Sequence, residues 1–297
     1  MSEPRPAGDV QHTVMTVLRA SEGWLEKRGV DAPKRSSELL LGSVLGVDRL
    51  QLYLDHDRPL DEQERAAMRA LLVRRGEGEP VAHLIGSWGF RDLELEVGPA
   101  VLIPRPETEE LVDVALQLLG EREGVDVLDL GTGSGAIAIA IASERPGAQV
   151  LAVDCSQNAL AIARSNAAGN DVGERVAFAH GSWWDAVEPG RTFDLVVSNP
   201  PYIDPSSAEG LADDVKRFEP PLALFSAPGD PASCYREIAA GLAAHLKPGG
   251  WFIAETGLGA AEPSREVLAT TAAMGSVELR GDASGKPRFL LAQRADS

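Results

Sequence analysis

The stretch VDVLDLGTGSG, residues 125–135, decides the fold. Its first six residues are typical of a buried strand, and a helical run, AIAIAIASE, follows the last glycine directly. Glycines at such a turn let the backbone bend tightly and approach a ligand without interference from Cβ atoms. The spacing is neither the G-x-G-x-x-G of dinucleotide sites nor a P-loop. The stretch therefore predicts a strand–loop–helix unit suited to a nucleotide-like cofactor.

Strand-like and helix-like segments alternate beyond this stretch. The strand-like ones are VDVLDL (125–130), AQVLAVD (148–154), RVAFAHG (175–181), FDLVVSN (193–199) and WFIAE (251–255). Apolar strands that alternate with helices predict a parallel sheet covered on both faces. The final stretch, SVELRGDASGKPRFLLAQ (276–293), predicts two strands without a helix between them, hence an antiparallel end to the sheet. The predicted fold is a doubly wound, Rossmann-like α/β sheet.

Residues 1–80 show a different pattern, with apolar stripes at helical spacing that predict a small helical bundle. Asp61 is the expected N-cap of one of its helices. Residues 81–103 form the predicted extended or β-hairpin connector, in which Leu93, Leu95 and Val97 alternate with polar side chains. Residues 104–297 then form the predicted catalytic domain.

The composition is that of a globular protein, with 44% hydrophobic and 25% charged residues. No apolar run is long enough for a membrane span, and the first ten residues lack the apolar core of a secretory signal. The only cysteines, Cys155 and Cys234, offer neither a disulfide framework nor zinc spacing, so we expect packing roles, a cytoplasmic location and no metal.

The net charge of −17 is unevenly distributed. Residues 1–80 hold 12 basic and 14 acidic side chains, so nearly all of the net negative charge lies in residues 81–297. Affinity for nucleic acid comes mainly from Lys and Arg at phosphates. The predicted catalytic domain is therefore a poor candidate for binding DNA or RNA directly.

Two aspartates accompany the glycine loop. Asp129 lies two residues before Gly131, and Asp154 ends the following strand. A carboxylate at the end of that strand can accept hydrogen bonds from ribose hydroxyl groups. The alternative role for Asp154 is that of a helix N-cap, which Ser156 could fill equally well.

The stretch SNPPY, residues 198–202, follows the fourth predicted strand and so lies at the same sheet edge as the glycine loop. A planar amino or amide nitrogen is a poor nucleophile, because its lone pair is delocalised. A site can help by accepting both N–H bonds, here with the Asn199 side-chain carbonyl and the Pro200 backbone carbonyl, while Tyr202 stacks on the planar group. The chemistry suits either the N6 amino group of adenine or the side-chain amide of glutamine.

The segment from Asp126 to Gly250 resembles the class I S-adenosylmethionine-dependent methyltransferases. RRGEGEPVAHLIG (74–86), LIPRPETEELV (102–112) and RFEPPLAL (217–224), in this order along the chain, resemble the HemK/PrmC family of release factor glutamine methyltransferases. The resemblance extends from about residue 36 to the C-terminus. It implies methyl transfer from S-adenosyl-L-methionine to the glutamine of the Gly-Gly-Gln motif in class I peptide chain release factors, with S-adenosyl-L-homocysteine as the second product.

The resemblance also implies roles for individual residues. Gly131, Thr132, Gly133, Ser134, Gly135, Asp154, Trp183 and Asn199 would bind the cofactor, and Asn199, Pro200, Pro201, Tyr202 and Phe90 the substrate glutamine. Asn199, Pro200 and Tyr202 would be the catalytic set. Family members often carry an acidic residue just before the aromatic that flanks adenine, whereas this chain has Ser182, which can accept a hydrogen bond without charge assistance.

We expect a direct SN2 transfer without a general base, since a lone histidine such as His180 is more often structural. Arg105 and Glu107 are candidates either for shaping the site or for an ordinary salt bridge. The alternatives are a ribosomal-protein glutamine methyltransferase, a DNA adenine-N6 methyltransferase and a non-catalytic cofactor-binding module. We expect a monomer whose N-terminal helices dock the release factor.

Overall fold

The structure is a computed structural model that describes residues 12–296. It divides into two compact units, Met1–Gly86 and Ser87–Ser297. The first eleven residues of the predicted helical segment 1–80 lie outside the described residues. Across the described part of the chain, no helix combines the length and apolar character needed to cross a membrane.

The first unit is helical. It contains α1 (Val14–Glu26), α2 (Pro33–Leu45), α3 (Arg49–Leu54), α4 (Glu62–Gly76) and α5 (Val81–Ile85). Leucines of α1, α2 and α3 and Met68 of α4 are buried together as its core. Asp61 is the N-cap of α4, and its side chain and that of Glu64 form a reciprocal capping box, so this sequence prediction is confirmed.

The second unit contains a seven-stranded sheet with the order β5-β4-β3-β6-β7-β9-β8. The strands are β3 (Asp126–Leu130), β4 (Gln149–Asp154), β5 (Val176–His180), β6 (Phe193–Ser198), β7 (Leu246–Glu255), β8 (Met274–Gly281) and β9 (Pro287–Arg294). The first five strands in this order are parallel, and β9 pairs antiparallel with both β7 and β8. The predicted mostly parallel, doubly wound sheet with an antiparallel end is confirmed.

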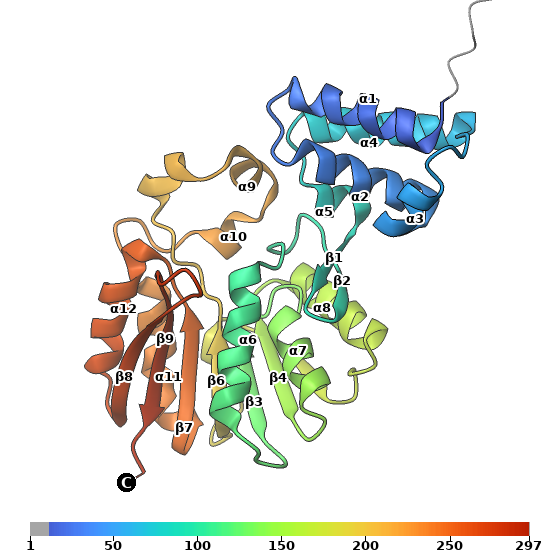
Figure 1. The fold of residues 1–297 in the computed structure, drawn as a ribbon. Coiled ribbons are helices and arrows are strands. Elements are labelled where there is room, and N and C mark those ends of the chain that lie inside the picture. Colours follow the sequence, from blue (N-terminus) through green and yellow to red (C-terminus); the bar gives the residue numbers. More distant parts are fainter. Residues whose placement is uncertain (1–11, 297) are drawn as a thin grey trace, which may run out of the picture. The chain divides into compact units, whose positions relative to one another are not determined.

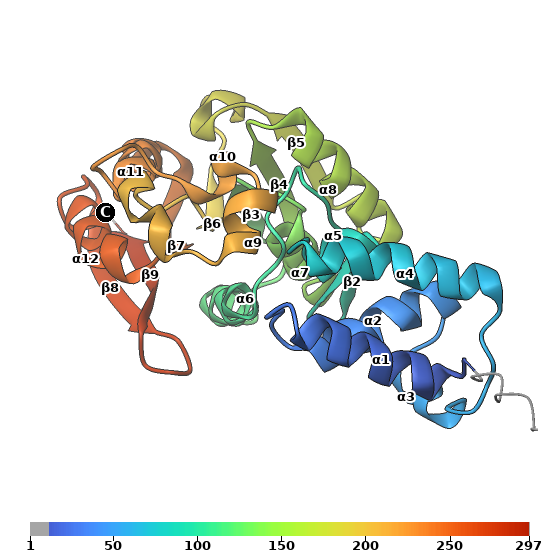
Figure 2. The same cartoon turned by 90° about the horizontal axis from the view of Figure 1, so that it is seen from above.

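Helices cover both faces of this sheet (Figures 1 and 2). Helices α6 (Pro106–Leu119), α7 (Ala136–Glu144) and α8 (Gln157–Gly169) lie on one face, and α11 (Ser233–His245) and α12 (Leu258–Ala269) on the other. Alternate residues of each central strand enter the two apolar cores, as a parallel sheet buried on both faces requires.

The strands β1 (Ser87–Phe90) and β2 (Leu93–Glu96) form the connecting hairpin. Asn166 of α8 fixes this hairpin to the glycine loop. Its Oδ1 accepts the Glu96 backbone N–H at 2.6 Å, and its Nδ2 donates to the Ser134 carbonyl at 2.9 Å. The connector thereby supports the segment that the sequence assigned to the cofactor.

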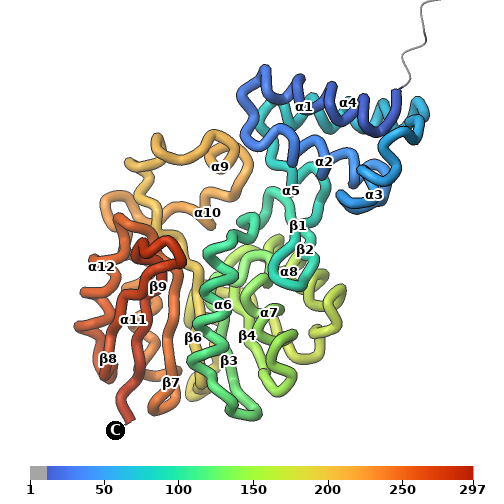
Figure 3. The backbone as a smooth tube through the Cα atoms, in the orientation of Figure 1, coloured from blue at the N-terminus to red at the C-terminus, as the bar shows by residue number. Residues whose placement is uncertain are grey.

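Beyond the carboxyl end of β6, the chain forms an excursion before it returns through α11 (Figure 3). The excursion contains the 3-10 helix η2 (Pro205–Gly210) and the short helices α9 (Asp213–Phe218) and α10 (Pro221–Leu224). It begins with the SNPPY stretch and contains the RFEPPLAL stretch, so two of the motifs singled out in the sequence belong to one loop system.

Candidate active site

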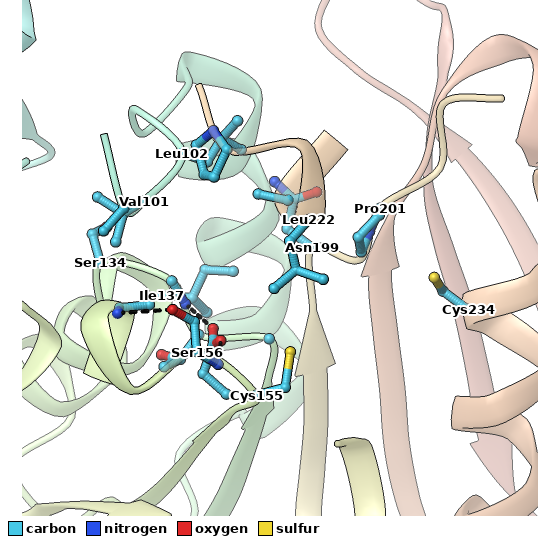
Figure 4. Close-up of a pocket in the computed structure, with 18 of the residues that line it drawn as sticks. Val101, Leu102, Ser134, Ile137, Cys155, Ser156, Asn199, Pro201, Leu222 and Cys234 are labelled. Atoms are coloured by element: carbon cyan, nitrogen blue, oxygen red, sulfur yellow. Dashed lines mark hydrogen bonds between the residues drawn. The ribbon is translucent and has the colours of Figure 1, made fainter. Parts of the chain in front are cut away.

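A cavity of about 340 Å³ lies at the carboxyl ends of β3, β4 and β6. Its volume is in the range of small-molecule sites, roughly 300–1,000 Å³. Figure 4 shows Ser134, Cys155 and Ser156 along one side of the cavity, with Asn199 and Leu222 across from them. The carboxyl edge of an open α/β sheet is where such folds bind ligands, and the geometry therefore matches the sequence prediction.

The glycine loop has a backbone that only glycine adopts readily. Gly131, Gly133 and Gly135 have φ angles of +74°, +57° and +84°. The backbone N–H groups of Gly131 and Thr132 both donate to the Val153 carbonyl of β4, at 2.9 and 3.0 Å. The loop is therefore fixed to the neighbouring strand, and its residues 131–134 line the cavity.

Asp154 connects this loop to helix α8. Its Oδ2 accepts the Gly133 backbone N–H and its Oδ1 accepts the Ser156 backbone N–H, each at 2.8 Å. Ser156, not Asp154, is the N-cap of α8, because its hydroxyl accepts the Ala159 N–H. Asp154 lines the cavity, and each of its oxygens has a further lone pair that a ribose hydroxyl can use.

Asp129 is fully buried below the glycine loop. The Thr132 hydroxyl donates to its Oδ2 at 2.6 Å. The pKa of Asp129 is raised to about 7, mainly by burial and also by the nearby Asp154 charge, while hydrogen bonds from the Thr132 hydroxyl and the Ala138 backbone oppose the rise. The loop thus rests on a carboxyl group whose charge is poorly solvated.

The tandem tryptophans after β5 have separate positions. Trp183 has a left-handed backbone, with φ +47°, and lines the cavity beside Ser182. Trp184 turns away: its indole N–H donates to the Ile238 carbonyl at 3.0 Å, and its ring stacks on His245. A Cβ on Gly241 would lie 2.3 Å from the Trp184 ring, so only glycine at position 241 leaves room for the ring in this position.

The SNPPY stretch places Asn199 directly after β6, at the cavity wall with Pro201. Asn199 Nδ2 donates to the Thr108 hydroxyl at 3.2 Å. Pro200 is buried. Tyr202 packs its ring on Gly257, where a Cβ would come within 2.7 Å, and its hydroxyl lies 3.4 Å from Glu255 Oε1.

The structure does not bring every predicted residue to the cavity. Among the described residues that line it, Gly135, Pro200, Tyr202 and Phe90 are not included. Phe90 is completely buried in the apolar core with Leu95 and residues of α6 and α7. The hairpin pairs Phe90 with Leu93 and directs its ring into this core, away from solvent. Burial of Tyr202 raises the pKa of its phenol, which therefore stays protonated.

Sequence reasoning missed part of the cavity wall. Val101, Leu102 and Pro104 precede α6, and Pro220, Leu222, Ala223 and Phe225 surround α10; all seven line the cavity. An ion pair between Arg105 and the buried Glu219 joins the two segments. Arg105 therefore forms a salt bridge, and because this bridge joins two segments of the cavity wall, it also shapes the site. The signal available in the sequence was that Arg105 and Glu219 both belong to stretches that resemble the family.

The remaining candidates are His180 and the two cysteines. His180 Nε2 lies 3.0 Å from the Cys155 backbone carbonyl, an arrangement consistent with a structural histidine. The exposed Cys155 and the half-buried Cys234 both line the cavity, so the expected packing role is wrong for Cys155. Burial raises the pKa of each thiol, to about 11 for Cys234. The protonated thiol is therefore the dominant form of both side chains.

The sheet order, the glycine loop and the carboxylate at the end of β4 together define the fold of the class I methyltransferases. Solved structures agree on this fold. The hMettl16 catalytic domain has a TM-score of 0.55, with 16% identity over 80% of this chain and 82% of that chain. A methyltransferase from Pyrococcus furiosus has a TM-score of 0.51, with 19% identity over 76% of this chain and 98% of that one.

Sequence comparison gives the particular family. Residues 16–86 match the PrmC N-terminal domain, and residues 110–214 match the methyltransferase small domain. The release factor glutamine methyltransferase of Caulobacter vibrioides is 41% identical over 90% of this chain and 91% of its own. That of Xylella fastidiosa (strain Temecula1) is 48% identical over 79% of this chain and 84% of its own. The chain belongs to the release factor glutamine methyltransferase family.

Proposed function

We propose that this protein transfers the methyl group of S-adenosyl-L-methionine to the side-chain amide N5 of the glutamine in the Gly-Gly-Gln motif of class I peptide chain release factors. The products are N5-methylglutamine and S-adenosyl-L-homocysteine. The observation that carries the proposal is the position of the Asn199 amide at the cavity wall, across from the glycine loop. Relatives named for this activity over most of their length support it.

The residues of the cavity fit the cofactor. The glycine loop offers backbone that can approach a ligand closely, Asp154 offers acceptors for ribose hydroxyls, and Trp183 offers an aromatic face for adenine. Ser182 lies beside Trp183 at the wall, as expected for a hydrogen bond to the adenine amino group. When bound, the cofactor supplies a methyl group on a positively charged sulfur.

The acceptor side of the cavity orients the substrate amide. Asn199 Oδ1 and the Pro200 carbonyl would accept the two N–H bonds of the glutamine side chain, which turns the nitrogen lone pair toward the methyl group. Fixing this orientation accounts for much of the expected rate acceleration, because the entropic cost of aligning the nitrogen with the methyl group is met when the substrate binds. The half-buried, protonated Tyr202 supports the stretch through Glu255 and Gly257.

The partner would be a protein, and the N-terminal helical unit would provide its docking surface. We expect a monomer that acts where translation terminates, in the cytoplasm. The acidic catalytic unit argues against DNA, because phosphate binding needs clusters of Lys and Arg.

The test is transfer of a labelled methyl group from the cofactor to purified substrates. We expect label in a class I release factor and none in the same factor with its Gly-Gly-Gln glutamine changed to alanine. Adenine-containing duplex DNA and ribosomal proteins serve as the alternative acceptors. Label in DNA or in a ribosomal protein, or an unlabelled release factor, would overturn the proposal.

A further inference from the structure

Asn199 begins a hydrogen-bonded chain of three polar side chains, in which Thr108 also lines the cavity. Asn199 Nδ2 donates to the Thr108 hydroxyl at 3.2 Å, and this hydroxyl donates to Glu255 Oε2 at 2.7 Å. Thr108 and Glu255 are both buried, with 4% and 2% of their surfaces exposed. Neither residue was singled out from the sequence, although Thr108 belongs to the LIPRPETEELV stretch.

The register of the sheet explains why these residues meet. Ser198 of β6 lies opposite Ala254 of β7, so Asn199 and Glu255 occupy the next positions at the carboxyl ends of the two strands. Opposed residues project to the same face, here the face that β6 and β7 pack against α6. Thr108, in the first turn of α6, lies between the two side chains.

The number of protons on each group determines which atom donates and which accepts in these two hydrogen bonds. A threonine hydroxyl has one proton, which Thr108 donates to the Glu255 carboxylate. Burial raises the pKa of Glu255, but the Thr108 hydrogen bond and the Arg288 charge oppose this rise and favour the ionised form, which can only accept. Because the Thr108 proton goes to Glu255, the Asn199 atom that contacts Thr108 has to be a donor, which is the Nδ2 amide group. The other amide atom, Oδ1, has no hydrogen-bond partner among the described residues and stays available at the cavity wall.

We infer that Thr108 and Glu255 are positioning residues for methyl transfer, because they hold the Asn199 amide with its oxygen toward the substrate. The reverse orientation would present an NH₂ group to the N–H bonds of the glutamine amide, and donor would face donor. This inference rests on the proposed function, since it assumes that the acceptor nitrogen carries hydrogens. It also assigns a role to a motif that is distant from SNPPY in the sequence.

Two further contacts hold Glu255 in place. The Tyr202 hydroxyl lies 3.4 Å from Glu255 Oε1, and the Tyr235 hydroxyl donates to the Glu255 backbone carbonyl at 2.6 Å. A buried carboxylate without such partners would be costly. The chain therefore runs from Asn199 to a fixed acceptor, and a rotation of the Asn199 amide would leave the Thr108 interaction without a donor.

The first test compares Thr108→Val, which keeps the shape but removes the hydroxyl, with Thr108→Ser, which keeps the hydroxyl. We expect Thr108→Val to lower kcat by about 10–100-fold, the size of a misorientation effect, with the cofactor Kd unchanged. Thr108→Ser should recover most of this loss. Equal kcat values for the two variants, or a cofactor Kd that weakens in step with kcat, would overturn the inference.

Glu255→Gln provides a second variant if Thr108→Val does not fold. The new amide can accept from Thr108 as the carboxylate does, or donate to it and release the Thr108 proton toward Asn199. Both orientations of Asn199 then become accessible, and kcat should fall to a value between those of Thr108→Ser and Thr108→Val. Because the residues act as one chain, the double variant should be no slower than Thr108→Val alone. Additive losses, or a wild-type rate in Glu255→Gln, would contradict the inference.

A measurement without substrate separates this inference from the proposed function. The side-chain amide protons of Asn199, assigned by NMR through their loss in Asn199→Ala, should exchange with solvent faster in Thr108→Val than in wild type or Thr108→Ser. Equal exchange in all three proteins would overturn the positioning role. An unlabelled release factor with wild-type enzyme would overturn the proposed function alone.

Discussion

The cofactor side and the acceptor side of the cavity are held by different means. On the cofactor side, backbone N–H groups of the glycine loop and of α8 converge on Asp154 and on the Val153 carbonyl. On the acceptor side, the buried side chains of Thr108 in α6 and Glu255 in β7 hold Asn199. The first side is local in sequence, whereas the acceptor contacts join residues 91 and 147 positions apart.

This difference predicts separable defects. Changes on the cofactor side should weaken cofactor binding, because they alter the surface that contacts it. Changes on the acceptor side should lower kcat and leave cofactor affinity intact, because they alter only the orientation of the amide that receives the methyl group. Variants with the opposite pattern would show that the two sides are not independent.

The largest effect is expected for Asn199→Ala. Loss of the amide removes one of the two acceptors for the substrate N–H bonds, and kcat should fall by about 10³-fold or more, the upper end for one preorganised hydrogen bond. Cofactor affinity, measured by calorimetry, should weaken much less than kcat and remain measurable, because Asn199 is only one of several residues expected to contact the cofactor.

Ser198→Ala is the matched control for this variant. The Ser198 hydroxyl donates to the Leu130 carbonyl at 2.7 Å, on the opposite face of the sheet, so its loss should cost stability but little kcat. An active Asn199→Ala enzyme would refute the role of the amide in orienting the substrate.

An intermediate effect is expected for Asp154→Ala. The substitution removes the acceptor of the Gly133 and Ser156 N–H groups together with the proposed ribose contact. Hydrogen bonds to a charged group contribute about 1.5–3 kcal/mol each, so the cofactor Kd should weaken by roughly 10–100-fold. At saturating cofactor, kcat should change much less.

Ser156→Ala separates loop support from helix capping. It removes the N-cap of α8 but keeps the backbone N–H that Asp154 accepts, so the thermal midpoint should fall with a smaller change in Kd. If both variants weaken the cofactor equally, the role of Asp154 is only to order the start of α8.

The contrast between short-range contacts on the cofactor side and long-range contacts on the acceptor side explains what could be predicted from the sequence. The strand–loop–helix pattern, the following Asp154 and the antiparallel end of the sheet follow local rules, and the fold agrees with them. Thr108 and Glu255 have no local signal, because only the register between β6 and β7 and the packing of α6 bring them to Asn199. Phe90 is the opposite case. Its resemblance to a family residue predicted a place in the substrate pocket, but its pairing with Leu93 in the hairpin directs it into the apolar core.

The smallest effect on activity is expected for Asp129, below the cofactor side, whose charge state should change stability instead. Its pKa of about 7 in the folded state lies above the ordinary value of 3.8, which applies to the unfolded chain. Between these two values the folded state holds one proton more, so raising the pH removes that proton from the folded protein. The stabilisation is complete below about pH 4 and is lost as the pH rises through about 7, with a slope on the order of 1 kcal/mol per pH unit.

Asp129→Asn should remove this slope, because the amide cannot ionise and its oxygen can still accept the Thr132 hydroxyl. The measurement is the free energy of unfolding in urea between pH 5 and 8, with the exposed Asp185→Asn as the control that keeps the wild-type slope. Parallel curves for wild type and Asp129→Asn would mean that Asp129 is already ionised at pH 5. The glycine loop would then rest on two negative charges, Asp129 and Asp154, and the positive sulfur of the cofactor would be stabilised by charge as well as by backbone geometry.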